Sequence, residues 1–358
     1  MAISDYEMIA AWTQVLKLSK LEAGQTVTVL TSASTHPQTL STALIASQSL
    51  GAIVNRLDLL PVNGEKALSR DPLAYLGTTP LTGNHAAIAA LKESDLVLDL
   101  MTLLFSPEQH DILKTGTKIL LAVEPPEILA RMVPTLGDRA RVLAAAKRIE
   151  GAREMRITSA AGTNLVCPLG EFPVISEYGF VDEPGRWDHW PSGFVLTFPD
   201  EGKASGTIVI DRGDILLPQK KYVDDAITLT VENGYAVDIA GGIDAALLRD
   251  YMEGFEDPEG YAISHIGWGL QPRAKWSTLG LYDREATIGM DARAFEGNFL
   301  FSLGPNNEAG GKRTTTCHID IPLRHCDVML DGKHVVRNGV VLDKPNADAS
   351  SDALSNVR

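Results

Sequence analysis

The chain has 358 residues, of which 44% are hydrophobic, and carries a formal net charge of −14 from 32 basic and 46 acidic side chains. Its length and apolar content suffice for two globular domains. The sequence has no run of about 18 apolar residues, the length that a membrane-spanning helix needs. The negative charge would repel a polyanion and no basic stripe interrupts it, so we expect no nucleic-acid partner.

The first half of the chain alternates predicted helices and strands. Ser4 and Glu7 form a capping box that should start the first helix. Continuous apolar runs separated by helical segments are typical of a parallel sheet covered on both faces. The sequence thus predicts an α/β domain with a mainly parallel sheet over residues 1–152. Its strands are expected at 25–33, 52–60, 95–101 and 118–124, and its helices at 37–50, 85–94 and around 142–149.

The second half has the pattern of antiparallel hairpins. Asn233-Gly234 separates two alternating strands within 227–240, which is the strongest local hairpin signal. Another hairpin is expected at 154–170, a three-stranded meander at 326–342 and a helix at 243–254. We therefore predict a mostly antiparallel α+β domain over residues 153–343, followed by a flexible tail at 344–358.

Common catalytic motifs are absent from the sequence. It has no G-x-G-x-x-G after a strand, no G-x-x-x-x-G-K-[ST], no H-E-x-x-H and no G-x-S-x-G. The parallel sheet is therefore not expected to bind a dinucleotide in the usual way. The eight histidines of the chain are the remaining candidates for catalysis or metal binding.

His318 lies in a β-branched run, TTTCHIDIPL (314–323), that should be a strand. Because side chains two residues apart share a strand face, His318 and Asp320 should point the same way. An imidazole and a carboxylate in this arrangement can provide two metal ligands. The alternative is a half-exposed polar strand face without a metal.

His265 lies in a second strand-like run, YAISHIGWGL (261–270), which ends at two glycines where a ligand can approach. A histidine among apolar residues is also often a simple core residue. Together with His318 and Asp320 it would complete a two-histidine, one-carboxylate set, which leaves open positions on a ferrous ion.

Three segments carry a family resemblance. They are ISHIGWG (263–269), LGPNNEAGGKRTTTCHIDIPL (303–323) and DHWPSG (188–193). Across essentially the whole chain the sequence resembles the 2,5-dihydroxypyridine 5,6-dioxygenases of bacterial nicotinate and nicotine degradation. The resemblance implies Fe(II) held by His265, His318 and Asp320, with dioxygen and a small aromatic ring as substrates. It also implies cleavage of the C5–C6 bond to N-formylmaleamate, and a homo-oligomer.

That family is similar in turn to thermophilic metallo-aminopeptidases, which suggests their two-domain fold and a hydrolase as the alternative function. The chain departs from the peptidase pattern at three places. Phe194 and Leu300 stand where the peptidases have a glutamate and a histidine, and His265 stands in place of a glutamate. These changes would reduce a dinuclear hydrolytic centre to a single His₂Asp site. A non-catalytic binding protein that keeps the fold is a further alternative.

The resemblance directs attention to further residues. His189, in RWDHW, is the candidate base that takes the substrate proton, since histidine can exchange protons near neutral pH. Glu177 is a second polar candidate for substrate binding. Leu104 and Phe105 follow a predicted strand and could form an apolar wall, and Trp268 could stack on the ring. For each, a surface or core role is the competing interpretation.

The compartment is predicted from cysteine usage and the first residues. Cys167, Cys317 and Cys326 include no CxxC pair, which fits a reducing environment better than a disulfide framework. The opening MAISDYEMIAAW lacks the basic and apolar regions of a secretory signal. We expect the protein in the cytoplasm, with no membrane association.

Overall fold

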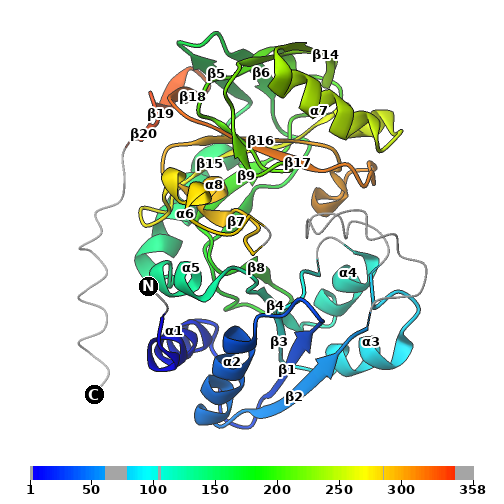
Figure 1. The fold of residues 1–358 in the computed structure, drawn as a ribbon, viewed down its shortest axis with the longest axis vertical. Coiled ribbons are helices and arrows are strands. Elements are labelled where there is room, and N and C mark those ends of the chain that lie inside the picture. Colours follow the sequence, from blue (N-terminus) through cyan, green and yellow to red (C-terminus); the bar gives the residue numbers. More distant parts are fainter. Residues whose placement is uncertain (1–2, 61–78, 104–105, 285, 343–358) are drawn as a thin grey trace. The chain divides into compact units, whose positions relative to one another are not determined.

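The computed structural model describes residues 3–60, 79–103, 106–284 and 286–342, and the chain divides into two units (Figure 1). Unit 1 contains Met1–Thr135, Tyr178–Ser192 and Tyr282–Met290; unit 2 contains Leu136–Glu177, Gly193–Leu281 and Asp291–Arg358. The predicted fold class is confirmed, because one unit has a parallel sheet with helices and the other has antiparallel sheets.

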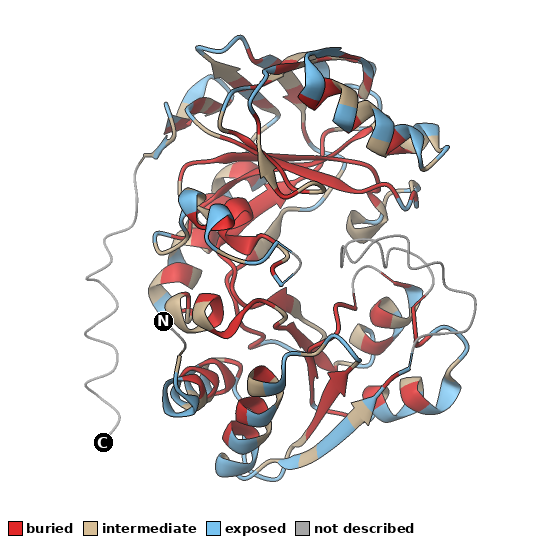
Figure 2. Cartoon of the chain, viewed as in Figure 1, coloured by how far each residue is buried: buried red, intermediate tan, exposed pale blue. Residues whose placement is uncertain are grey.

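Unit 1 is built on a five-stranded sheet in the order β2-β1-β3-β4-β8, in which every neighbouring pair is parallel. Its strands are β1 (Thr26–Thr31), β2 (Ile53–Asp58), β3 (Leu96–Asp99), β4 (Lys118–Leu121) and β8 (Trp187–His189). Figure 2 shows the central strands buried, whereas β2 at the edge is largely exposed. The first four strands are confirmed predictions, whereas β8 joins them from a distant part of the chain.

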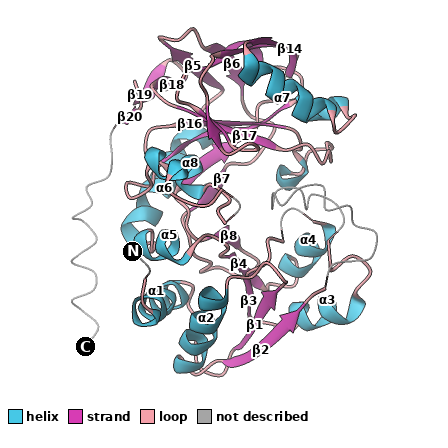
Figure 3. Ribbon diagram, viewed as in Figure 1, coloured by secondary structure: helices cyan, strands magenta, loops and turns pink. Residues whose placement is uncertain are grey.

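Helices lie on both sides of this sheet, as in other doubly wound folds (Figure 3). They are α1 (Asp5–Leu18), α2 (Pro37–Ser49), α3 (His85–Lys92), α4 (Pro107–Leu113) and α5 (Pro126–Arg131). The predicted capping box of α1 is present, with the Ser4 and Glu7 side chains bonding each other's backbone N–H. Apolar side chains of α3 and α4, including Leu91 and Ile112, pack with Val97 and Ile119 of the sheet.

Unit 2 contains two larger antiparallel sheets and a small one, β11 (Ile215–Leu216) with β12 (Lys221–Tyr222). The eight-stranded sheet has the order β14-β13-β10-β6-β5-β18-β19-β20. Its strands are β5 (Glu154–Ser159), β6 (Asn164–Pro168), β10 (Ser205–Ile210), β13 (Ile227–Glu232), β14 (Tyr235–Gly241), β18 (Cys326–Leu330), β19 (Lys333–Arg337) and β20 (Val340–Val341). All three predicted hairpin regions are confirmed here.

The five-stranded sheet of unit 2 has the order β17-β16-β15-β9-β7. Its strands are β7 (Ile175–Glu177), β9 (Phe194–Thr197), β15 (Ile263–Gly269), β16 (Phe299–Leu303) and β17 (Ile319–Leu323). Nearly every residue of β9, β15, β16 and β17 is buried, so both faces of this sheet are covered. The sheet carries the two predicted metal-binding segments.

Helices and short 3₁₀ turns complete unit 2. They are α6 (Leu136–Glu150), α7 (Ile243–Glu253), α8 (Met290–Ala294, whose first residue is counted in unit 1), η2 (Pro258–Tyr261), η3 (Trp276–Gly280) and η4 (Asn307–Ala309). α7 packs on β13 and β14, and α6 packs on β7 and β9. The helix predicted around 142–149 is therefore present, but α6 belongs to unit 2 and does not close the first domain as its position in the sequence suggests. No helix in the described ranges is both long and apolar enough to cross a bilayer.

Candidate metal centre

One face of the five-stranded sheet carries the candidate ligands. Ser302 of β16 pairs with Asp320 of β17, so these two side chains point to the same face. Leu300 and Gly267 form the next pair on that face, and Gly269 pairs with Phe194 beyond it. The face therefore joins a small polar cluster to an apolar surface.

A β-bulge directs His265 toward this cluster. Ile263 pairs with Leu303 and Ile266 pairs with Phe301, so β15 has one extra residue between these two pairs. A bulge leaves a backbone N–H without a ladder partner and changes the direction of a side chain. Here the His265 N–H donates to Ser302 Oγ at 2.9 Å, which satisfies the buried group.

The three predicted ligands come together. His265 Nε2 lies 3.0 Å and His318 Nε2 lies 3.3 Å from Asp320 Oδ1, and the two nitrogens are 3.4 Å apart. All three side chains are at most 6% exposed. His318 precedes β17 rather than lying within it, yet it stays on the same side as Asp320, two residues later.

The spacing of these atoms fits a metal ion. Donor atoms about 2.1 Å from one ion, at angles between octahedral and tetrahedral, lie about 3.0–3.4 Å from each other. Asp320 Oδ1 is buried and makes no well-aligned hydrogen bond among the described residues, although two ring nitrogens face it. A cation between the three atoms would satisfy them together, and no atom of the three would need to move far.

Arg293 of α8 is a further charged group at this site. Its Nε donates to Asp320 Oδ2 at 2.6 Å, and both side chains are almost fully buried. Burial by itself raises the pKa of Asp320, but the charges of His318, Arg293 and His265 outweigh it and hold that pKa well below its usual range. Asp320 is therefore held as a carboxylate, the form that binds metals.

Sequence reasoning missed Arg293, Ser302 and Glu308 as members of this region. Glu308 lies on η4, where burial, reinforced by the Glu177 and Asp320 carboxylates, raises its pKa well above the ordinary value. Nothing local in the sequence identifies Arg293 or Glu308, because their interactions at this site are with residues distant in sequence, such as Asp320 and Glu177. The pairing of β16 with β17 would have identified Ser302, since it places this residue opposite Asp320.

His189 is the last residue of β8 in unit 1 and is 7% exposed, which excludes the alternative of an exposed loop histidine. Its Nδ1 lies 2.8 Å from the Pro191 carbonyl oxygen. A carbonyl can only accept, so Nδ1 carries the hydrogen and Nε2 is the acceptor nitrogen of the neutral ring. Asp188 accepts the His189 backbone N–H at 2.8 Å and holds the strand end.

Glu177 ends β7 in unit 2 and is 6% exposed, so it is not a solvated loop carboxylate. It pairs with Phe194 and therefore shares the face that carries Asp320. Its charge acts on Glu308 within the same unit. The predictions for Leu104 and Phe105 concern residues outside the described ranges.

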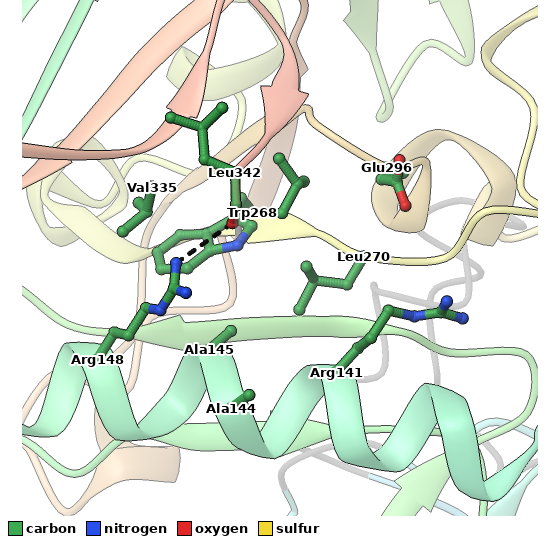
Figure 4. Close-up of a pocket in the computed structure, with 10 residues that line it drawn as sticks. Arg141, Ala144, Ala145, Arg148, Trp268, Leu270, Glu296, Val335 and Leu342 are labelled. Atoms are coloured by element: carbon green, nitrogen blue, oxygen red, sulfur yellow. Dashed lines mark hydrogen bonds between the residues drawn. The ribbon is translucent and has the colours of Figure 1, made fainter. Parts of the chain in front are cut away.

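Trp268 lies on the other face of β15, because it is three residues from His265. It pairs with Phe299 and borders a small cavity between the sheet, α6 and β19 (Figure 4). Ala144, Ala145 and Val335 are among its neighbours in this cavity, and the tryptophan is 1% exposed. This placement corrects the expected stacking on a substrate beside the metal ligands. Trp268 is a core residue under α6.

The chain is similar to known proteins over almost its whole length. Residues 7–343 match the family described as 2,5-dihydroxypyridine 5,6-dioxygenase. A 2,5-dihydroxypyridine 5,6-dioxygenase from Pseudomonas putida KT2440 is 55% identical over 342 residues, which are 96% of this chain and 98% of that protein.

Solved structures are similar over the same extent. The structure of 2,5-dihydroxypyridine dioxygenase from P. putida KT2440 matches with a TM-score of 0.94 and 54% identity, covering 97% of this chain and 99% of that one. Wild-type AmpT from Thermus thermophilus matches with a TM-score of 0.58 and 13% identity, covering 94% and 99%. The second likeness concerns the fold alone.

Proposed function

The chain belongs to the 2,5-dihydroxypyridine 5,6-dioxygenase family, and on that premise we propose that His265, His318 and Asp320 hold a single ferrous ion at which the ring is opened. The family is a ring-cleaving dioxygenase family, so this chain is an enzyme that uses dioxygen. The observation that carries the metal assignment is the triangle of donor atoms, with sides of 3.0, 3.3 and 3.4 Å.

The donor set favours iron over other metals. Two imidazoles and one carboxylate with positions left open are typical of non-haem Fe(II) oxygenases. When bound, ferrous iron supplies the electron transfer that allows triplet dioxygen to react with a closed-shell aromatic ring. The buried free cysteines Cys167, Cys317 and Cys326 fit a reducing compartment, so we expect a cytoplasmic enzyme in which the iron remains ferrous.

The protein's own groups perform the remaining tasks. His189 would take the proton of the substrate hydroxyl at Nε2, because Nδ1 is committed to the Pro191 carbonyl. Glu177 would bind a polar edge of the ring, as a buried carboxylate on the same sheet face as Asp320. Phe194 and Leu300 would limit the water on that face, since both are buried and apolar.

The expected product is N-formylmaleamate, from cleavage between C5 and C6 of 2,5-dihydroxypyridine. We further expect a role in nicotinate or nicotine degradation and a homo-oligomer, as the family resemblance implies. Leu104 and Phe105 remain predicted members of the substrate pocket.

Metal analysis and oxygen uptake test the proposal directly. The protein is purified and reconstituted anaerobically with ferrous iron, and oxygen consumption is followed on addition of 2,5-dihydroxypyridine. About one iron per chain and stoichiometric oxygen uptake are expected. Two zinc ions per chain with hydrolysis of an aminoacyl-p-nitroanilide would instead indicate a peptidase. Phe194 and Leu300 argue against that outcome, because they offer no ligand atoms on the triad's face.

A further inference from the structure

The two carboxylate oxygens of Asp320 have different environments. Oδ1 faces the Nε2 atoms of His265 and His318, at 3.0 and 3.3 Å. Oδ2 accepts a hydrogen bond from Arg293 Nε at 2.6 Å. A charge-assisted hydrogen bond of this length is among the strong ones in proteins, so Oδ2 is firmly held on the arginine side.

The arginine is itself placed by a specific docking of α8. Asn298 Nδ2 donates to the Arg293 carbonyl at 2.7 Å and to the Ala292 carbonyl at 3.2 Å, while its Oδ1 accepts the Gly269 N–H at 2.6 Å. Asn298 therefore ties the end of the helix to the end of β15.

Gly269 permits this close approach. A Cβ at this position would lie 2.2 Å from the Phe295 carbonyl oxygen and 2.7 Å from that of Ala294. These are backbone atoms, which cannot move aside as a flexible side chain could. Asn298 and Gly269 thus fix the helix end, and with it the direction of the Arg293 guanidinium.

We propose that Arg293 is a positioning residue that restricts Asp320 to one-oxygen binding of the metal. This inference rests on the proposed function. An aspartate can bind a metal through one oxygen or through both, and binding through both would occupy a position that the reaction needs. With Oδ2 bound to Arg293, only Oδ1 is directed at the site. Lysine would keep the charge but would lack the planar geometry of the guanidinium.

The test replaces Arg293 in the full-length protein with methionine and with lysine. Arg293→Met has a similar length and donates no hydrogen bond. The matched control is Arg141→Met, which removes another buried-aspartate partner in unit 2, since Arg141 bonds Asp138 on α6. Each apoprotein is titrated with Co²⁺, whose visible absorption per bound ion weakens as the number of donor atoms rises, and steady-state rates are measured after loading with Fe²⁺.

Arg293→Met should bind one Co²⁺ with weaker absorption per ion than the wild type. Its kcat with saturating iron should fall about 10- to 100-fold, the range seen when groups behind metal ligands are removed. Arg293→Lys should recover part of the rate and of the spectrum, and Arg141→Met should match the wild type in both. If the methionine variant does not fold, as judged by its melting curve, the lysine variant carries the spectral comparison.

The inference is overturned if Arg293→Met and wild type share the same cobalt spectrum and the same kcat. It is also overturned if Arg293→Met and Arg141→Met lose stability equally and neither variant changes the cobalt spectrum. Failure of the proposed function would look different, because wild-type protein and His318→Ala would then bind Co²⁺ alike.

Discussion

At the scale of single residues, the site depends on three side chains from β15 and from the segment that leads into β17, two strands that are separated by β16. His318→Ala removes one corner of the donor triangle without touching the sheet's hydrogen-bond ladder, because the histidine precedes β17. We expect iron binding and turnover to fall to background, while the melting temperature changes by only a few degrees. Iron content after desalting and the circular dichroism melting curve measure the two effects.

His85→Ala is the matched control, since His85 is exposed at the start of α3. It should retain iron and full activity. A His318→Ala enzyme that keeps wild-type iron and rate would remove this residue from the metal site.

His189→Ala separates proton transfer from metal binding. The variant should keep its iron, because the proposed ligands are all in other segments, and should lose about 10²- to 10⁴-fold in kcat, the usual contribution of a general base. The loss should be largest below the pKa of the substrate hydroxyl, where the substrate still carries its proton. The measurements are iron content and kcat across pH. Loss of iron in this variant would show that His189 is a ligand and not the base.

At the scale of elements, the close contact between β15 and the end of α8 should be sensitive to a single methyl group. In Gly269→Ala the new Cβ meets two backbone carbonyl oxygens within 3 Å, so strand or helix must shift. Overpacking of this kind costs about 1–3 kcal/mol. We expect that loss in unfolding free energy together with weaker iron retention, because Arg293 moves with the helix.

Gly254→Ala provides the comparison, because Gly254 is exposed after α7 and a Cβ there would meet its nearest atom at 3.4 Å. Chemical denaturation and metal titration of both variants give the result. Equal stability of the two variants would contradict this prediction, because it would mean that β15 and α8 accommodate the methyl group at Gly269 without loss of stability.

Local sequence signals predicted most elements correctly, because those elements depend on neighbouring residues. Asn233-Gly234 specifies its own hairpin, and the Ser4–Glu7 capping box specifies the start of α1. The H-x-D spacing placed His318 and Asp320 on one face for the same reason. Positions set by distant pairing were beyond such reasoning. β8 is three residues long and joins the parallel sheet only through β4, so His189 was assigned to the wrong part of the fold.

The side of a sheet to which a side chain points was also predictable only where the pairing of its strand was known. Alternation along β15 places Trp268 opposite His265, yet the nearness of the two residues in sequence suggested a shared pocket. Arg293 reaches Asp320 only because Gly269 and Asn298 hold α8 against the sheet. No sequence pattern within residues 290–294 predicts that contact, since it is made by side chains and backbone from three separate segments.

At the scale of the whole molecule, stability should respond to pH through Asp99. This residue ends β3, is fully buried, and accepts hydrogen bonds from the Met101 and Leu103 backbone N–H groups at 2.9 and 2.5 Å. The intervening Thr102 has φ +69°, an unusual conformation for a β-branched residue that this carboxyl group supports. Burial raises the pKa of Asp99 to about 6, although the backbone hydrogen bonds oppose the rise.

The raised pKa of Asp99 determines whether stability rises or falls with pH. The folded state prefers the protonated carboxyl more than the unfolded state does, so this contribution is complete below the ordinary aspartate pKa of about 4 and is lost as pH rises through about 6. At most it is worth about 3 kcal/mol. Asp99→Asn removes the titration, so wild type should exceed the variant in stability by the largest margin in acid, and the margin should shrink between about pH 4 and about pH 6 and stay constant above that. Unfolding free energies from pH 4 to 8 test this, with Asp238→Asn, at an exposed position of β14, as a control with no such trend. A margin that grows with pH would instead show that the backbone N–H groups stabilise the carboxylate more than burial disfavours it.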